Sequence, residues 1–184
     1  MKRILLFCLL GCVGYQAKDK LIDSQATKTA ESAKVSMNDP KDDPENLKKI
    51  HSMFNIYKLT FNSVTNLPPK KVVAIKDVVY VDVRDDNERS VSMIKNALTK
   101  KEFLASSDKF KDKTVVAYCT IGFRSGLFTK DLLKKGFDAY NMLGGLLLWS
   151  HENYEVYSGP KKTNKIHVYG ATWDLLKSGY VSVY

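Results

Sequence analysis

The pattern of hydrophobic and polar positions divides the chain into three parts. Residues 4–10 are an apolar run, residues 13–50 are polar, and short apolar runs recur at intervals after residue 50. Continuous apolar runs of four or five residues are typical of strands that are covered on both faces of a parallel sheet. The pattern therefore predicts one folded domain over residues 51–184, preceded by a polar segment.

Strand and helix signals alternate along this domain. We expect buried strands at residues 78–81 and 114–118, another strand at residues 139–142, and a short strand at residues 96–98. We expect helices at residues 61–67, 100–106, 125–135 and 145–149, the first of them stopped by Pro68 and Pro69. Alternation of this kind predicts the α/β class, with an open parallel sheet flanked by helices.

The N-terminal segment has the pattern of an export signal. Lys2 and Arg3 precede an apolar run that is too short to span a bilayer. The run ends in Leu9-Leu10-Gly11-Cys12, which resembles a bacterial lipobox. We therefore expect a lipoprotein signal peptide over residues 1–11, lipidation of Cys12 and a membrane-anchored protein on the periplasmic or extracellular face of the envelope. An ordinary signal peptide and a buried first strand are the alternatives.

Residues 12–50 are expected to form a flexible polar tether. Seven lysines balance seven acidic residues between positions 13 and 50, and Tyr15 is the only aromatic residue there. Such a segment buries too little apolar surface to offset the entropy lost on ordering.

Charge and cysteine content narrow the function. The net charge of +9 suits small anions or an acidic membrane surface, but the lysines are scattered, so we do not expect nucleic-acid binding. Of the three cysteines, Cys8 and Cys12 lie in the N-terminal segment and only Cys119 lies in the domain, which excludes a disulfide framework there. The three histidines lack metal-ligand spacing, and we expect neither a metal nor a cofactor.

The most informative segment surrounds Cys119, which follows a predicted buried strand and precedes a predicted helix. Open α/β sheets bind ligands at the carboxyl ends of their strands. Loop N–H groups, a turn permitted by Gly122 and the positive end of the helix would favour a thiolate at Cys119. We predict Cys119 as the nucleophile, with the remainder of the loop as substrate-binding residues: Thr120, Ile121, Gly122, Phe123, Arg124 and Ser125.

Several side chains near this loop have two interpretations. Arg124 offers forked donors suited to an anion, or it pairs with a carboxylate behind the loop. Ser125 suits a helix N-terminus as well as a ligand, and Asp82 and Arg84 are expected to be a structural pair near the pocket. Trp149 and Trp173 are expected in the core or in a lid, and Ile121 and Phe123 at the pocket mouth.

Cys119-Thr120-Ile121-Gly122-Phe123-Arg124-Ser125 resembles the rhodanese active-site loop, C-x-x-G-x-R-S. The resemblance covers roughly residues 55–157 and includes further motifs in the expected order: Val81-Asp82-Val83-Arg84 with Glu88, Ile94-Lys95-Asn96-Ala97 and Gly144-Gly145-Leu146-Leu147-Leu148-Trp149. The tail, residues 163–169 with Trp173, also resembles the ending of some single-domain bacterial rhodaneses. Met93, Lys95 and Asn96 depart from the family pattern at positions that are mainly structural.

The resemblance implies a sulfurtransferase. Cys119 would take a sulfane sulfur from a small anionic donor, thiosulfate or similar, hold it as a persulfide and pass it to a thiophilic acceptor. Thr120 and Ile121 stand where some thiosulfate-specialised members carry charged residues. The alternatives are a non-catalytic rhodanese module that binds a partner and a phosphatase-like or arsenate-reductase-like activity. The relatives with those two activities have five residues between cysteine and arginine, whereas this loop has four.

Overall fold

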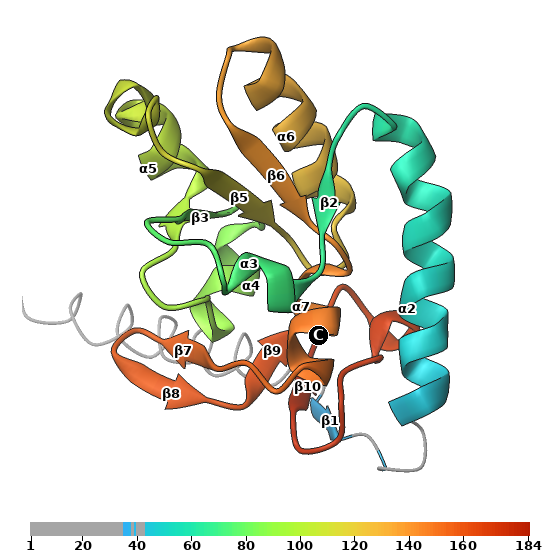
Figure 1. Ribbon diagram of the computed structural model, residues 1–184. Coiled ribbons are helices and arrows are strands. Elements are labelled where there is room, and N and C mark those ends of the chain that lie inside the picture. Colours follow the sequence, from blue (N-terminus) through green and yellow to red (C-terminus); the bar gives the residue numbers. More distant parts are fainter. Residues whose placement is uncertain (1–34, 38, 40–42) are drawn as a thin grey trace, which may run out of the picture. The chain divides into compact units, whose positions relative to one another are not determined.

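The three longest predicted strands are neighbours in one parallel sheet in the computed structural model (Figure 1). This sheet has five parallel strands in the order β2-β6-β5-β3-β4. The bounds of its strands are β2 Asn66–Leu67, β3 Val79–Asp82, β4 Leu98–Thr99, β5 Val115–Tyr118 and β6 Ala139–Met142. The predicted α/β class, with an open parallel sheet flanked by helices, is confirmed.

The structure describes residues 35–37, 39 and 43–184. The predicted signal peptide, Cys12 and most of the predicted tether lie outside the described residues. The described residues all belong to one unit, Lys34–Tyr184.

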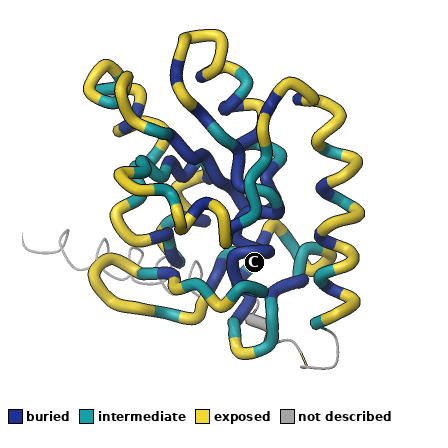
Figure 2. Tube along the Cα trace, in the orientation of Figure 1, coloured by how far each residue is buried: buried dark blue, intermediate teal, exposed yellow. Residues whose placement is uncertain are grey.

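Strand β5 lies at the centre of the core because both of its faces are covered. Val115 and Ala117 face one apolar cluster, whereas Val116 and Tyr118 face another. Successive side chains of a strand point to opposite faces, so an entirely apolar run requires helices on both sides. Strand β5 is accordingly buried along its whole length (Figure 2).

Helices cover both faces of the sheet. Phe103 of α5 and Phe128 and Leu132 of α6 pack with Val115 and Ala117. The other face is covered by α2, α3 and α7, which contribute to the cluster around Val116. The helix bounds are α2 Asp43–Tyr57, α3 Pro69–Val72, α4 Asp86–Val91, α5 Lys100–Ala105, α6 Phe123–Lys134 and α7 Gly145–His151, with 3-10 helices η2 Lys58–Phe61, η3 Ser107–Phe110 and η4 Ala171–Trp173.

The C-terminal residues add two small sheets. A hairpin joins β7 Val156–Ser158 to β8 Lys161–Thr163, and β9 Lys165–His167 pairs in parallel with β10 Val181–Val183. Strand β1, Val35–Met37, pairs antiparallel with β10. The chain between β9 and β10 carries Tyr169 and Trp173, which reach the candidate site described below.

The domain begins earlier than the predicted boundary at residue 51. Residues 43–50, assigned to the tether, form the first half of α2, and its buried side chains Asn46, Ile50 and Phe54 recur every four residues. That spacing places them on one helix face, which packs on the core. The carboxylate of Asp43 also accepts hydrogen bonds from the backbone N–H and the hydroxyl of Ser178, at 2.7 and 2.8 Å. Most residues between 43 and 50 are polar, so the sequence pattern alone did not indicate that one face of this segment is buried.

The helix predicted over residues 61–67 is wrong. Phe61 is instead the last residue of η2, and Asn66 and Leu67 form the edge strand β2. A residue before proline is pushed away from the helical region, and Leu67 precedes Pro68. The carbonyls of Thr65 and Leu67 accept the N–H groups of Asn141 and Leu143 at 3.1 and 2.9 Å, so β6 holds the segment in an extended form.

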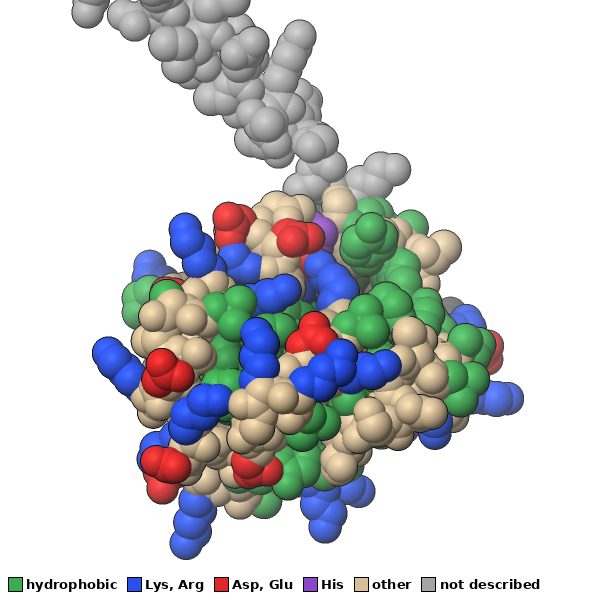
Figure 3. Space-filling model, turned by 90° about the horizontal axis from the view of Figure 1, so that it is seen from above, with side chains coloured by type: hydrophobic (Ala, Val, Ile, Leu, Met, Phe, Trp, Pro, Cys, Tyr) green, Lys and Arg blue, Asp and Glu red, His purple; other side chains and the backbone are tan. Residues whose placement is uncertain are grey.

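The surface drawn in Figure 3 carries charges of both signs. Lysine and arginine side chains lie around the rim and across this face, interspersed with acidic and apolar ones. The view therefore has no patch of a single sign. No helix among the described residues combines the length and the apolar character needed to cross a bilayer.

Candidate active site

The sulfur of Cys119 lies at the carboxyl edge of the parallel sheet. Cys119 directly follows β5, is 2% exposed, and is a free cysteine. Its sulfur accepts the N–H of Gly122 at 3.1 Å, and the hydroxyl of Ser125 lies 3.6 Å away. The sequence-based placement of Cys119 between a buried strand and the start of a helix agrees with this geometry.

The turn that returns the loop to its own sulfur depends on Gly122. Gly122 caps α6 with a φ of 97°, in the left-handed region that residues with a Cβ rarely adopt. A Cβ there would lie 2.7 Å from the ring of Phe54 and 2.9 Å from the Met142 carbonyl oxygen. Backbone conformation and close packing therefore both require glycine at this position.

The first turn of α7 supports the loop from behind. The N–H groups of Leu146 and Leu147 donate to the carbonyl oxygens of Cys119 and Thr120, at 3.0 and 3.1 Å. These N–H groups have no partner within their own helix, so the active loop satisfies them. The Gly144-Gly145 pair allows this close approach, and the function of that motif is to position the loop.

Asn141 is a positioning residue that the sequence analysis missed. It lies fully buried on β6, and its Nδ2 donates to the carbonyl of Gly122 at 2.9 Å and to Asn66 Oδ1 at 2.8 Å. A buried amide side chain is costly unless it is hydrogen-bonded, so its position in an otherwise apolar strand was the available signal.

Arg124 is held by carboxylates, which is the second of its two predicted interpretations. Its Nη1 and Nη2 donate to Glu88 Oε2 and Oε1 at 2.6 and 2.7 Å, and Nη1 also lies 3.3 Å from Asp85 Oδ2. Two parallel bonds of this kind fix the guanidinium plane. Thr120 joins the group, because its hydroxyl lies 3.1 Å from Glu88 Oε1 and 3.4 Å from Arg124 Nη2.

The ion pair shifts the pKa of both partners. Burial alone raises the pKa of Glu88, but hydrogen bonds from Arg124 and the Asp85 N–H, together with nearby arginine charges, lower it below 4.5 overall. Burial by itself lowers the pKa of Arg124, but the hydrogen bonds to Glu88 and the Coulombic interactions with Cys119, Glu88 and Asp85 outweigh it, so that the pKa is raised overall. Both groups therefore remain charged at neutral pH.

Asp82 and Arg84 form the expected structural pair behind this site. Arg84 Nε and Nη2 donate to the Asp82 carboxylate at 3.0 and 2.7 Å, and Nη2 also donates to the Ser92 carbonyl at 2.6 Å. Both side chains are fully buried. Burial lowers the pKa of Arg84, but the Asp82 carboxylate raises it by more.

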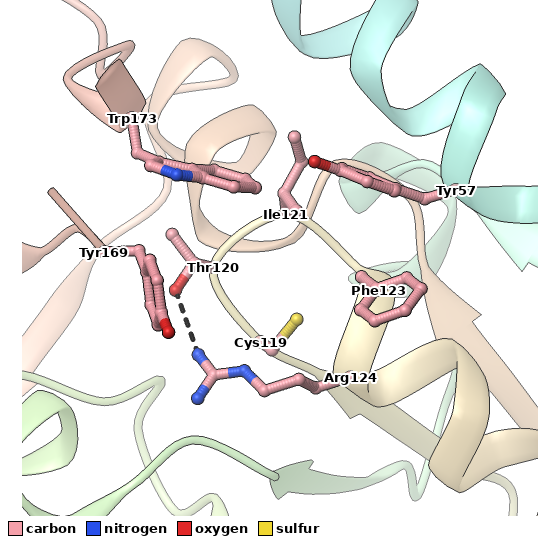
Figure 4. Close-up of a pocket in the computed structure, with 8 residues that line it drawn as sticks. All are labelled: Tyr57, Cys119, Thr120, Ile121, Phe123, Arg124, Tyr169 and Trp173. Atoms are coloured by element: carbon pink, nitrogen blue, oxygen red, sulfur yellow. Dashed lines mark hydrogen bonds between the residues drawn. The ribbon is translucent and has the colours of Figure 1, made fainter. Parts of the chain in front are cut away.

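A cavity of about 330 Å³ opens above Cys119 (Figure 4). The loop contributes Cys119, Thr120, Ile121, Phe123 and Arg124 to its lining. Three more aromatic residues complete it: Tyr57 from the end of α2, Tyr169, and Trp173 from η4. Of the predicted substrate-binding residues, Gly122 and Ser125 instead contact the sulfur from below, within the buried part of the loop.

We expect Glu88→Gln to lower the free energy of unfolding by about 2 kcal/mol, since hydrogen bonds to charged groups contribute roughly 1.5–3 kcal/mol. Glu102→Gln is the matched control. Glu102 occupies the same position in its helix and accepts the Thr99 N–H at 2.8 Å, but it is exposed and bonds to Thr99 rather than to an arginine. Urea denaturation at pH 7 measures both. Equal losses in the two variants would contradict a stabilising role for the Arg124 pair.

The same pair predicts a pH dependence. A carboxyl with a lowered folded pKa contributes stability above its unfolded pKa and loses it as the pH falls through the folded pKa. The unfolding free energy of the wild type should therefore exceed that of Glu88→Gln by a constant amount above about pH 5.5. That difference should shrink below 4.5, the unperturbed pKa of a glutamate.

Residues 70–152, from α3 to α7, match the family described as Rhodanese-like domain. This stretch, 83 of the 184 residues, is similar to a rhodanese-like domain. The match includes the Cys119 loop, Glu88 and Asn141, whereas Tyr57, Tyr169 and Trp173 lie outside it.

Curated relatives of the rhodanese-like domain include two kinds of enzyme. A tRNA uridine(34) hydroxylase of Cytophaga hutchinsonii is 32% identical over 115 residues, which cover 56% of this chain and 37% of that protein. The thiosulfate sulfurtransferase GlpE of Coxiella burnetii is 29% identical over 97 residues, which cover 50% of this chain and 89% of that protein. The chain thus spans about a third of the hydroxylase and most of the sulfurtransferase.

A solved structure supports the fold. The thiosulfate sulfurtransferase from Pseudomonas aeruginosa superposes with a TM-score of 0.50 and 16% sequence identity, over 61% of this chain and 23% of that one. At this identity the likeness concerns the fold alone.

Proposed function

We propose that this protein is a sulfurtransferase that carries sulfur as a persulfide on Cys119. The observation that carries the proposal is the position of the Cys119 sulfur, which accepts the Gly122 N–H at the start of α6 and lies at the base of a cavity. An N–H group and a helix N-terminus aimed at one sulfur stabilise negative charge on it. This environment suits both the attacking thiolate and the persulfide anion that it forms.

The proposed reaction has two steps. In the first, the thiolate of Cys119 attacks a sulfane sulfur, a new S–S bond forms, and the bond between that sulfur and the donor breaks with its electron pair leaving on the donor. In the second, a thiophilic acceptor attacks the outer sulfur and Cys119 leaves as a thiolate. Loop N–H groups support the charge in both steps, while Glu88 keeps the Arg124 side chain in place beside the cavity.

Sulfur loading of the full chain tests the proposal. The protein is incubated with thiosulfate and, separately, with a polysulfide, and peptide masses locate any added sulfur among Cys8, Cys12 and Cys119. We expect one sulfur on the Cys119 peptide, removed by cyanide. A folded protein with a free Cys119 thiol that takes no sulfur from either donor would instead favour a partner-binding module. Hydrolysis of a phosphoaryl ester would favour the phosphatase-like alternative.

The location of the protein is a second part of the proposal. Lipid attachment at Cys12 and anchoring to a membrane of the bacterial envelope rest on the lipobox-like Leu9-Leu10-Gly11-Cys12. Lipid labelling that is lost in Cys12→Ala would support this membrane anchoring, and labelling that persists would contradict it.

A further inference from the structure

Four aromatic side chains form a continuous wall around the cavity above Cys119 (Figure 4). The Tyr57 ring lies 5.2 Å from the Phe123 ring and 6.2 Å from the Trp173 ring, measured between centroids, and Tyr169 lies 6.1 Å from Trp173. We call Tyr57, Phe123, Tyr169 and Trp173 the aromatic wall. Three of its members lie outside the matched residues 70–152, so the wall is built largely by the extensions of this chain.

The charges beside the cavity are unfavourable for a doubly charged donor. Arg124 is the only cationic side chain in the described lining of the cavity, and Glu88 and Asp85 both contact its guanidinium. Two carboxylates thus oppose one arginine, and the reacting thiolate adds another negative charge. Like charges brought together disfavour binding. Thiosulfate carries two negative charges, whereas the persulfide group of an organic persulfide with an uncharged carbon group carries at most one.

The size of the cavity also exceeds what a small inorganic anion fills. A water molecule takes about 30 Å³ in the liquid, so a cavity of about 330 Å³ has room for an organic group of several heavy atoms. Pockets that bind organic ligands are lined mainly by aromatic and apolar side chains with a few polar groups that fix orientation. The aromatic wall with Ile121 and the adjacent Thr120 and Arg124 match that composition.

We propose that the donor at this site is a small organic persulfide with an aromatic or otherwise apolar carbon group, and that the aromatic wall binds this group. The inference rests on the persulfide function proposed above. The thiolate of Cys119 attacks the outer sulfur of R–S–SH, and an S–S bond forms between them. The S–S bond of the donor breaks and its electron pair leaves with R–S⁻, while the proton stays on the transferred sulfur. No external oxidant or reductant is needed.

A comparison of two persulfides that share the same reactive S–S bond but differ in their carbon group measures the effect of the carbon group alone. Benzyl persulfide carries an apolar ring, and cysteine persulfide carries a charged, polar group. The rate of sulfur loading on Cys119 of the full chain is followed by rapid quench and the mass of the Cys119 peptide, and each rate is divided by that of the same donor with free cysteine. We expect the normalised rate for benzyl persulfide to be about tenfold higher, because its ring packs on the aromatic wall.

Variants of the wall provide the specificity test. Trp173→Ala should lower the benzyl persulfide rate about fivefold and change the cysteine persulfide rate less than about twofold. Tyr169→Ala is the second variant, because Tyr169 is 70% exposed and its loss leaves the core intact. Tyr157→Ala is the matched control, since this tyrosine lies on β7 and outside the cavity lining.

The outcomes test the inference about the donor separately from the proposed sulfurtransferase function. Equal normalised rates for the two persulfides, or wall variants that slow both donors alike, would overturn the inference while sulfur loading itself still supports the function. Thiosulfate that loads faster than either persulfide would also overturn it. A folded protein that takes sulfur from none of the three donors would overturn the proposed function.

Discussion

Cys119→Ser is expected to abolish sulfur uptake and to lower turnover of sulfane sulfur by at least about 10³-fold, because a serine hydroxyl forms no persulfide and is a far weaker nucleophile than a thiolate. Serine is similar in size to the cysteine, and the hydrogen-bond donors Gly122 N–H and Ser125 Oγ remain beside it. The fold should therefore persist, and the loss should be chemical. Peptide masses after donor treatment and the rate of thiocyanate formation from cyanide measure the two effects.

Cys8→Ser and Cys12→Ser are the matched controls for this prediction, since they remove the other two thiols of the chain. Both should load one sulfur as the wild type does. Sulfur uptake that survives in Cys119→Ser and disappears in one of the controls would place the reactive thiol in the N-terminal segment and remove the proposed mechanism.

Gly145→Ala is expected to lower the free energy of unfolding by about 3–4 kcal/mol, combining roughly 1–2 kcal/mol for a left-handed backbone with roughly 1–3 kcal/mol for overpacking. Gly145 has a φ of 51°, and an added Cβ would lie 2.2 Å from the Cys119 carbonyl oxygen and 2.7 Å from that of Thr120. Because these carbonyls accept the N–H groups of Leu146 and Leu147, relieving the clash separates α7 from the active loop. We therefore also expect sulfur loading to slow by at least about tenfold, since misplacement by about 1 Å has costs of that order or larger.

Gly159→Ala separates the two contributions to this loss. Gly159 has a φ of 56°, and an added Cβ there would meet nothing within 4 Å. Gly159→Ala should therefore lower the free energy of unfolding only by the backbone contribution, about 1–2 kcal/mol, and leave the rate of sulfur loading unchanged. Urea denaturation at constant pH measures both variants. If Gly145→Ala and Gly159→Ala lose the same stability and load sulfur at the same rate, close packing at Gly145 does not support the loop.

The sequence predicted the local geometry of the Cys119 loop better than it predicted the residues around that loop. Cys119, Gly122 and Ser125 lie within seven consecutive residues, so their placement around one sulfur follows from a single strand-turn-helix unit. The carboxylate partners of Arg124 could not be placed from this local unit. Glu88 is 36 residues away along the chain, and only the pairing of β3 with β5 brings its helix beside the loop. The alternatives for Arg124 could therefore not be separated from local pattern.

The pattern of apolar runs was sufficient to predict the positions of the central strands and of α6. The strands predicted at 78–81, 114–118 and 139–142 lie within one residue of β3, β5 and β6. Burial on both faces favours apolar side chains at most positions of such a strand, and this leaves a clear local signal. The edge strand β2 left none, because its pairing with β6 rather than its own composition determines it.

By itself, the sequence determined an α/β domain with a parallel sheet and one cysteine at the carboxyl end of a central strand, since these follow from patterns over a few neighbouring residues. Tertiary structure alone decided that residues 43–50 belong to the domain and that Asn141 and α7 hold the loop. It also decided that Tyr57, Tyr169 and Trp173 meet over Cys119. These features depend on contacts between segments that are distant in the sequence or on backbone partners, and the pattern of side chains within one short segment does not specify either of them.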